Sequence, residues 1–340
     1  MRYRLLGRSG LRVSELCLGA MTFGSAAAPD EAVAIVRRFE EAGGNFIDTA
    51  NRYGRGESER IVGDAIRHNR DRWVLATKYT LTSDATDPNA GGAHRKSQRR
   101  AIDASLKRLG TDYVDVYWVH IWDPHTSVEE VVSSLDDLVR SGKVLYVGIS
   151  DTPAWLVARA VTMAEQRGLA RFDALQVPYS LVRRTVEREL LPMARALDLT
   201  VTGWAPLAGG LLTGRYGSDR DRPTDGRWAS RAPSERDLLI CDTLNEVAAA
   251  RDASAGQVAI AWVRAQRHRA MTIPIVGART EEQLVDAVKA VEFDLDATEL
   301  ARLEEVSRIE PGFPGDFDAA ELVCGDALER IDDDRTTTGS

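Results

Sequence analysis

Short apolar runs alternate with longer amphipathic segments over most of the chain, and this alternation limits the possible folds more than any other feature. Eight runs have the length and the composition of buried strands. A strand-then-helix order that repeats in this way predicts a parallel sheet whose faces are covered by helices. The eight runs span residues 15–19, 45–48, 73–78, 113–120, 144–150, 172–176, 199–204 and 271–277.

The segments between these runs carry helix start and stop signals. Pro29-Asp30 opens a helix that runs through Phe39, and Ser127 with Glu130 has the spacing of a capping box. Thr152-Pro153 places a proline just inside the start of another helix, which ends at Gly168. Further helices are expected at residues 57–68, 93–109, 187–197, 234–251, 254–267 and 280–291.

Eight strand–helix units close naturally into a (β/α)8 TIM barrel. An open, doubly wound sheet is the alternative, but it lacks a proper dinucleotide fingerprint, because Gly54-Arg55-Gly56 is followed by Glu57-Ser58-Glu59 with a glutamate where the last glycine belongs. Residues 3–14 predict a β-hairpin before the first barrel strand. The long segment between Trp204 and Ser234 predicts an extended loop on the carboxyl-end face.

The length of 340 residues suggests two domains of average size, but one α/β barrel routinely takes more than about 200 residues. We therefore expect a single barrel domain over residues 1–330. The last ten residues, 331–340, have the polar and acidic composition of a disordered tail.

Composition and charge exclude several classes of protein. With 44 basic and 52 acidic residues the net charge is −8, which disfavours a nucleic-acid partner. Apolar runs stop at about six residues, far below the roughly 20 of a membrane span, and the start of the chain lacks the apolar stretch of a signal peptide. Cys17, Cys241 and Cys324 are too widely separated for a metal site or a disulfide framework. We expect a soluble, cytoplasmic protein with no metal and no membrane contact.

Polar residues end several of the apolar runs. Asp48, Lys78, His120, Ser150 and Gln176 each stand at a predicted carboxyl end of a strand. Taken singly, each has a structural explanation, since aspartates cap turns, lysines reach solvent and histidines bond within cores. In a barrel these strand ends surround one mouth, which is where active sites form. As a set, they are better explained as an active site.

Tyr53, five residues beyond Asp48, lies within reach of the same mouth. A phenol with an ordinary pKa of about 10 becomes a useful acid when a nearby cation stabilises its phenolate. Lys78 supplies such a cation, Asp48 can hold it charged, and His120 can polarise a carbonyl oxygen. This set protonates a developing alkoxide but supplies no hydride, so a reduction needs a cofactor.

A series of motifs resembles those of the aldo-keto reductases, in the same order over residues 3 to about 310. The resemblance implies a barrel that reduces a small aldehyde or ketone with NADPH. It assigns Tyr53 as proton donor, Lys78 and Asp48 as its tuning pair, and His120 as the residue that orients the carbonyl group. The motifs are FIDTANRYG (46–54), GESE (56–59), ATK (76–78), SLKRLGTDY (105–113), VH (119–120), GKV (142–144), GIS (148–150), QVPYS (176–180), WAPLAGG (204–210) and IPIVGAR (273–279).

The resemblance also implies a set of cofactor contacts. Ser150 and Gln176 match the positions that bond the nicotinamide carboxamide, and Trp204 matches the aromatic ring that stacks on the nicotinamide. Arg279 follows Gly277 at a helix start, where a 2′-phosphate would be favoured. The remaining expected cofactor contacts are Leu207, Gly209, Gly277 and Gln283.

Two positions depart from the family pattern. The family commonly has Ser-Asn after the fifth strand, where this chain has Ser150-Asp151. Asp151 can still accept a hydrogen bond, so it is kept among the cofactor contacts. The family often has Glu-Asn in the last barrel helix, where this chain has Asp286-Ala287. Ala287 removes an adenine contact, which leaves the preference for NADPH over NADH open.

The substrate pocket is expected to include Met21, Phe23 and Trp122 from the loops at the mouth. The natural substrate and the oligomeric state do not follow from the sequence. Two other functions stay open at this point. One is an NADPH-binding regulatory subunit of the same fold with little turnover, and the other is a cofactor-free lyase that uses Lys78 as a Schiff base.

Overall fold

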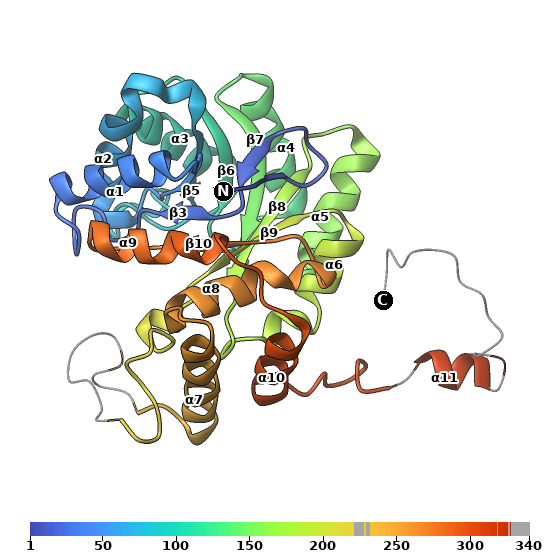
Figure 1. Cartoon of the computed structure of the whole chain (residues 1–340). Coiled ribbons are helices and arrows are strands. Elements are labelled where there is room, and N and C mark those ends of the chain that lie inside the picture. Colours follow the sequence, from blue (N-terminus) through green and yellow to red (C-terminus); the bar gives the residue numbers. More distant parts are fainter. Residues whose placement is uncertain (221–227, 229–231, 318, 326, 328–340) are drawn as a thin grey trace.

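Eight parallel strands form a closed barrel in the computed structural model, which describes residues 1–220, 228, 232–317, 319–325 and 327. The order around the barrel is β10-β3-β4-β5-β6-β7-β8-β9, and β10 pairs with β3 to close it (Figure 1). The strands are β3 (Cys17–Gly19), β4 (Phe46–Asp48), β5 (Val74–Tyr79), β6 (Val114–Val119), β7 (Val144–Ser150), β8 (Phe172–Pro178), β9 (Thr200–Trp204) and β10 (Thr272–Val276).

The predicted fold class is therefore confirmed, since each of the eight predicted runs overlaps one barrel strand. The alternative of an open sheet is wrong, because Ile275 of β10 pairs with Cys17 of β3. Helices follow the strands and surround the barrel. They are α1 (Pro29–Glu41), α2 (Glu57–Ile66), α3 (Arg95–Leu109), α4 (Val128–Arg140), α5 (Ala154–Arg167), α6 (Leu190–Ala196), α7 (Glu235–Ala250), α8 (Ala255–Ala265), α9 (Glu281–Val288) and α10 (Ala297–Ser307).

Two predicted helix starts differ in detail. Ser127 accepts a hydrogen bond from the Glu130 backbone as expected, but the Glu130 carboxylate accepts from the Arg95 backbone N–H (3.1 Å) and stabilises the start of α3 instead. Pro153 is the N-cap residue of α5 and so stands just outside the helix. The first difference arises because the start of α3 takes the Glu130 carboxylate, which would otherwise cap α4.

The predicted N-terminal hairpin is present as β1 (Tyr3–Leu5) paired with β2 (Arg12–Ser14). Leu6 and Val13 are completely buried in the same apolar cluster as barrel residues such as Phe46. The Gly7 N–H donates to Thr200 Oγ1 at 2.8 Å, at the amino end of β9. The hairpin thus closes the amino end of the barrel, which leaves the carboxyl end as the open face.

The barrel interior is filled by side chains, with Trp118 of β6 as its largest member. A Cβ atom on Gly148 would lie 2.3 Å from the Trp118 ring, so the glycine makes room for the indole. A second, larger apolar cluster fills the space between the strands and the helices. The rigid interior fixes the strand ends on which the polar residues stand.

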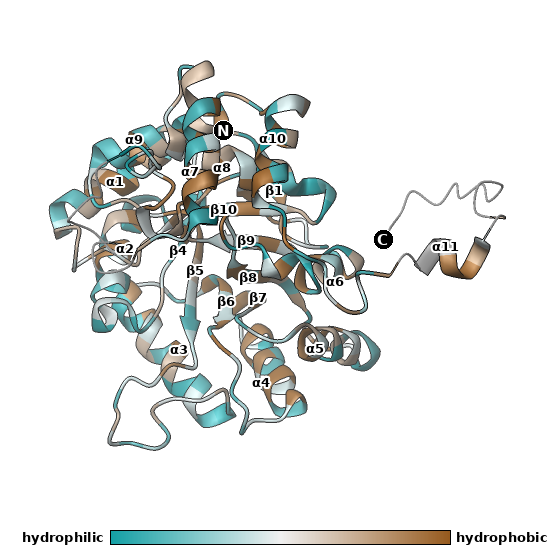
Figure 2. Ribbon diagram, turned by 90° about the horizontal axis from the view of Figure 1, so that it is seen from below, coloured by the Kyte–Doolittle hydropathy of each residue, from teal (hydrophilic) through white to brown (hydrophobic). Residues whose placement is uncertain are grey.

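The C-terminal part of the chain leaves the barrel after α10. Helix α11 (Ala319–Cys324) is set apart from the barrel in both views (Figures 1 and 2). The expected disordered tail, residues 331–340, lies outside the described residues. Among the helices that the structure describes, none combines the length and apolar character that crossing a bilayer requires.

Candidate active site

The centre of the open face is a buried lysine. Lys78 of β5 has no exposed surface and forms an ion pair with Asp48, the last residue of the neighbouring strand β4. Its Nζ atom also donates to the Thr49 carbonyl at 3.0 Å and to the Tyr53 hydroxyl at 3.1 Å. The ammonium group therefore has three partners, and one of them is the phenol that begins the 3₁₀ turn Tyr53–Gly56.

Electrostatics keep this lysine charged. Burial alone lowers the pKa of Lys78, but Asp48 and Tyr53 outweigh it and raise the pKa above its usual value. Burial raises the pKa of Asp48, and the Lys78 ammonium acts against that rise. At neutral pH a charged ammonium group therefore lies beside the Tyr53 hydroxyl.

His120, the first residue after β6, faces the same phenol. Its ring meets the Tyr53 ring edge-on, with centroids 5.9 Å apart and an interplanar angle of 86°. Burial, together with the Lys78 charge, lowers the pKa of His120 to about 3. The imidazole is therefore neutral, and its buried Nδ1 has no hydrogen-bond partner among the described residues.

The backbone that presents His120 is strained. Its N–H donates to Thr80 Oγ1 at 3.2 Å, and Thr80 has a φ of +93°. This conformation is unfavourable for a β-branched residue, and such strain gathers at functional sites. The strand ends β5 and β6 therefore hold the histidine at a defined position.

The residues expected near the nicotinamide lie together on the next three strands. Ser150 ends β7 and is paired in register with Gln176 of β8, whose Nε2 donates to Asp48 Oδ1 at 3.3 Å. The Asp151 N–H donates to the Gln176 carbonyl at 3.2 Å. Trp204 ends β9, is partly exposed, and donates from Nε1 to Asp151 Oδ1 at 3.3 Å. The structure thus connects these four residues to one another and to the Lys78 pair.

The residues expected near the phosphates lie at the rim. Leu207 is 3.7 Å from the position of a Cβ atom on Gly256 of α8, and Gly209 has a φ of +70° in the loop after β9. Gly277 and Arg279 are exposed beyond β10. The Arg279 N–H donates to Gln283 Oε1 at 3.0 Å, and its guanidinium makes no hydrogen bond or ion pair within the described part of the chain.

Asp286 and Ala287, which depart from the family pattern, both contribute to the packing of α9. Asp286 accepts from Ser254 Oγ at 2.9 Å and from Gln257 Nε2 at 2.6 Å, so it joins α9 to the start of α8. Ala287 is buried at 8% exposure. The small side chain packs inward and offers no polar group at this position.

The three expected pocket residues differ in exposure. Met21 is 46% exposed, and Trp122 is partly buried and packs against the cluster between barrel and helices. Phe23 is completely buried in the cluster between barrel and helices, so the expectation that it lines the pocket is corrected. It packs beneath the loop that follows β3, because an aromatic side chain there fills the space between loop and barrel.

Ser58 and Glu59 support the site, although the sequence pattern assigns them no role. Ser58 contacts Thr49 Oγ1 at 2.8 Å and donates to the Ala20 carbonyl at 2.7 Å. Glu59 is completely buried and accepts from Thr77 Oγ1 and from Arg108 Nε, both at 2.6 Å. Thr49 and Thr77 are the neighbours of Asp48 and Lys78, so the first turn of α2 holds the strands that carry the ion pair. The sequence feature that could have indicated this role is the pair of polar residues, Ser58 and Glu59, on the inner face of a predicted helix.

The sequence model of the aldo/keto reductase family matches residues 15–308. Norsolorinic acid reductase from Emericella nidulans is 40% identical over 91% of this chain and 82% of its own length. An aryl-alcohol dehydrogenase from Pestalotiopsis microspora is 37% identical over 93% of this chain and 85% of its own length. An uncharacterised oxidoreductase from Bacillus subtilis is 39% identical, with 93% and 97% covered.

Proposed function

Because the chain belongs to the aldo/keto reductase family and is an oxidoreductase, we propose that it reduces an aldehyde or ketone with NADPH, using Tyr53 as the proton donor. The observation that carries the proposal is the contact between the buried Lys78 ammonium and the Tyr53 hydroxyl, at 3.1 Å. Such a contact prepares a phenol to give up its proton.

The residues of the open face fit a nicotinamide dinucleotide. Arg279 has a guanidinium that no described residue engages, beside an exposed glycine and the start of α9, where an anion is favoured. Ser150, Gln176 and Trp204 would hold the nicotinamide end. When bound there, NADPH supplies the hydride that the protein side chains lack.

The side chains of the chain perform the proton transfer and the orientation. Tyr53 donates its hydroxyl proton to the developing alkoxide, and Lys78 stabilises the resulting phenolate. Asp48 holds the ammonium in place. His120 is neutral, so it donates a hydrogen bond to the carbonyl oxygen without adding a charge to the site.

We extend the proposal to aryl aldehydes as the substrate class. One relative is named as an aryl-alcohol dehydrogenase, and it matches 93% of this chain. The partly buried Trp122, close to His120 in sequence, gives an aromatic surface suited to an aryl group.

The decisive variant is Tyr53→Phe, which removes the proton and keeps the ring. Reduction of benzaldehyde should fall by about 10²- to 10⁴-fold in kcat, while the Kd for NADPH stays within about threefold. Turnover equal to that of the wild type would reject Tyr53 as the acid. NADPH binding without turnover of any carbonyl in a panel would favour the regulatory subunit. A lysine adduct trapped by borohydride, without dinucleotide binding, would favour the lyase.

A further inference from the structure

Asp151, where the family commonly has asparagine, is held in place by its neighbours. Its φ is +41°, in the left-handed region that aspartate adopts only as an isolated residue. Its carboxylate accepts from Trp204 Nε1 at 3.3 Å, and its N–H donates to the Gln176 carbonyl at 3.2 Å. The carboxylate is therefore fixed at the edge of the ring that is expected to stack on the nicotinamide.

A cation lies over the Trp204 ring. The guanidinium carbon of Arg183 is 5.6 Å from the centroid of the Trp204 ring. Arg183 and Ser180 exchange backbone hydrogen bonds of 3.0 and 3.3 Å, which shape the loop after β8. The Trp204 indole is thus set between an acidic group at its edge and a basic group near its ring.

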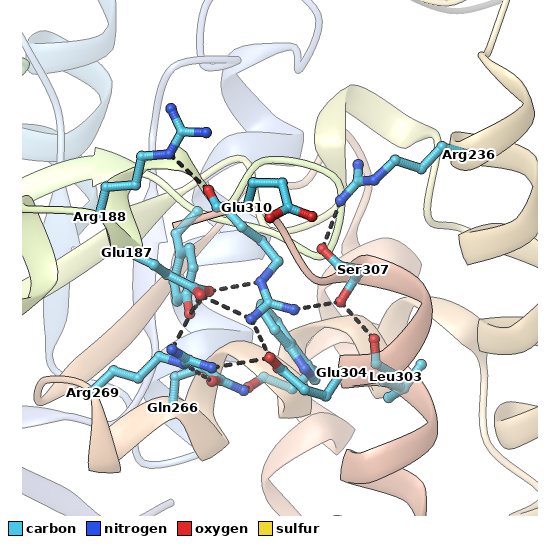
Figure 3. A network of polar contacts seen from close by, with 12 residues as sticks. Glu187, Arg188, Arg236, Gln266, Arg269, Leu303, Glu304, Ser307 and Glu310 are labelled. Atoms are coloured by element: carbon cyan, nitrogen blue, oxygen red, sulfur yellow. Dashed lines mark hydrogen bonds and ion pairs between the residues drawn. The ribbon is translucent and has the colours of Figure 1, made fainter. Parts of the chain in front are cut away.

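The loop that carries Arg183 is anchored through its neighbour. Arg184 is 1% exposed and donates two 2.8 Å hydrogen bonds to the Glu187 carboxylate. It also donates to Glu304 Oε1 at 2.8 Å and to Ser307 Oγ at 2.7 Å, within the network that joins this loop to α10 (Figure 3). Because this anchor is buried and makes four hydrogen bonds, it fixes the loop from which Arg183 extends over Trp204.

The two redox forms of the nicotinamide ring differ by one charge, since the oxidised ring is a cation and the reduced ring is neutral. A fixed carboxylate therefore stabilises the oxidised form selectively, whereas asparagine would accept the same hydrogen bonds without this selectivity. Burial raises the pKa of Asp151, while Trp204, Lys78 and Arg183 act against the rise.

We propose that Asp151 sets the redox preference of the dinucleotide site, so that NADP⁺ binds more tightly relative to NADPH than it would beside asparagine. The inference rests on the proposed function. Arg183 opposes the effect, because its positive charge lies near the same ring. Trp204 is the positioning residue that holds the carboxylate at this place.

The test is the ratio Kd(NADPH)/Kd(NADP⁺), measured by isothermal titration calorimetry without a carbonyl substrate. Asp151→Asn should lower this ratio on the order of tenfold. Arg183→Gln should raise it, and Trp204→Phe, which keeps a ring but removes the N–H donor, should lower it by less than Asp151→Asn does. Asp173→Asn is the matched control, because this aspartate lies at the amino end of β8 and should leave the ratio unchanged.

The outcomes separate the two proposals. If the wild type binds both dinucleotides and Asp151→Asn leaves the ratio within about twofold, the charge-tuning role is wrong and the proposed function stands. An equal fall in the ratio for Asp173→Asn would also overturn it, because the effect would then follow from total charge. If the wild type binds neither dinucleotide, the proposed function itself fails.

Discussion

Two buried ion pairs stand at opposite ends of the barrel, and their surroundings differ. Lys78 and Asp48 at the open end have side-chain exposures of 0% and 3%, and Arg264 and Glu15 at the closed end have 3% each. Burial and pairing alone therefore do not distinguish the proposed catalytic pair from a structural one.

The difference lies in the remaining partners. Glu15 also accepts from the Arg2 backbone at 2.6 Å and from Arg4 at 3.3 Å, and Arg264 donates to the Ala290 carbonyl at 2.6 Å. These contacts bind the hairpin to α8 and to the segment after α9. At the open end, Lys78 instead donates to the Tyr53 hydroxyl, beside a neutral histidine with an unpaired nitrogen. The hydrogen bond to the Tyr53 hydroxyl is thus the feature that sets the proposed catalytic pair apart from the pair at the closed end.

The largest expected effect follows from Lys78→Met. This change removes the cation that stabilises the phenolate, so kcat for benzaldehyde should fall by about 10²- to 10⁴-fold. It also leaves Asp48 buried without its partner, which should lower the free energy of unfolding by about 3–5 kcal/mol. Steady-state kinetics and urea denaturation measure the two effects separately.

The double variant Asp48→Asn/Lys78→Met separates catalysis from stability at this pair. Removing both charges should recover most of the lost stability, since no unpaired charge is left buried. Activity should stay low, because the cation beside Tyr53 is still missing. Recovery of activity together with stability would show that the lysine acts only through the fold.

The ion pair at the closed end should affect stability without affecting turnover. Glu15→Gln keeps the side-chain volume but removes the buried carboxylate that pairs with Arg264, which keeps only the exposed Asp294 as an acidic partner at 3.2 Å. The free energy of unfolding should therefore fall by about 3 kcal/mol. Because the hairpin lies at the other end of the barrel, kcat should change by less than about twofold. Urea denaturation and kinetics on the same samples test this. A fall in kcat comparable to that of Lys78→Met would erase the distinction between the two pairs.

The strands and the polar residues at their ends could be predicted from the sequence, because both follow from local pattern and barrel geometry. Apolar runs mark the strands, and closure brings Asp48, Lys78 and His120 to one face. Helix α10 was not predicted, although Asp296 and Glu299 form the capping box that starts it. Its signal is local, but the helix lies after the last strand–helix unit and outside the repeating pattern.

The contacts that hold the site could not be predicted in the same way. Glu59 and Arg108 are 49 residues apart, and their hydrogen bond depends on how α2 packs against α3. The placement of Arg183 beside Trp204 depends on a loop that Arg184 anchors to Glu304, 120 residues later in the chain. The burial of Phe23 could not be predicted for the same reason. Loop residues have no periodic pattern that distinguishes a side chain lining the pocket from one packed in the core.

The smallest expected effect is a difference between the two ends of the barrel in how folding stability changes as the pH falls. His120 has a pKa of about 3 in the folded protein against an ordinary value of 6.5. Between these values the unfolded chain binds a proton that the folded chain does not, so this contribution to stability is complete above pH 6.5 and is lost as the pH falls toward 3.

The free energy of unfolding of the wild type, minus that of His120→Asn, should therefore decrease by about 1 kcal/mol per pH unit between pH 6 and 5. Urea denaturation of both proteins at each pH measures this difference. The ion pair at the closed end should lose its contribution to stability only at a lower pH. Burial alone would raise the pKa of Glu15, but the Arg2 N–H and Arg264 outweigh it and lower the pKa below 4.5. Its contribution is present above pH 4.5 and is lost only below that value. The open end should thus lose stability first on acidification, and a difference between wild type and variant that is flat from pH 6 to 5 would show that His120 is protonated in the folded site.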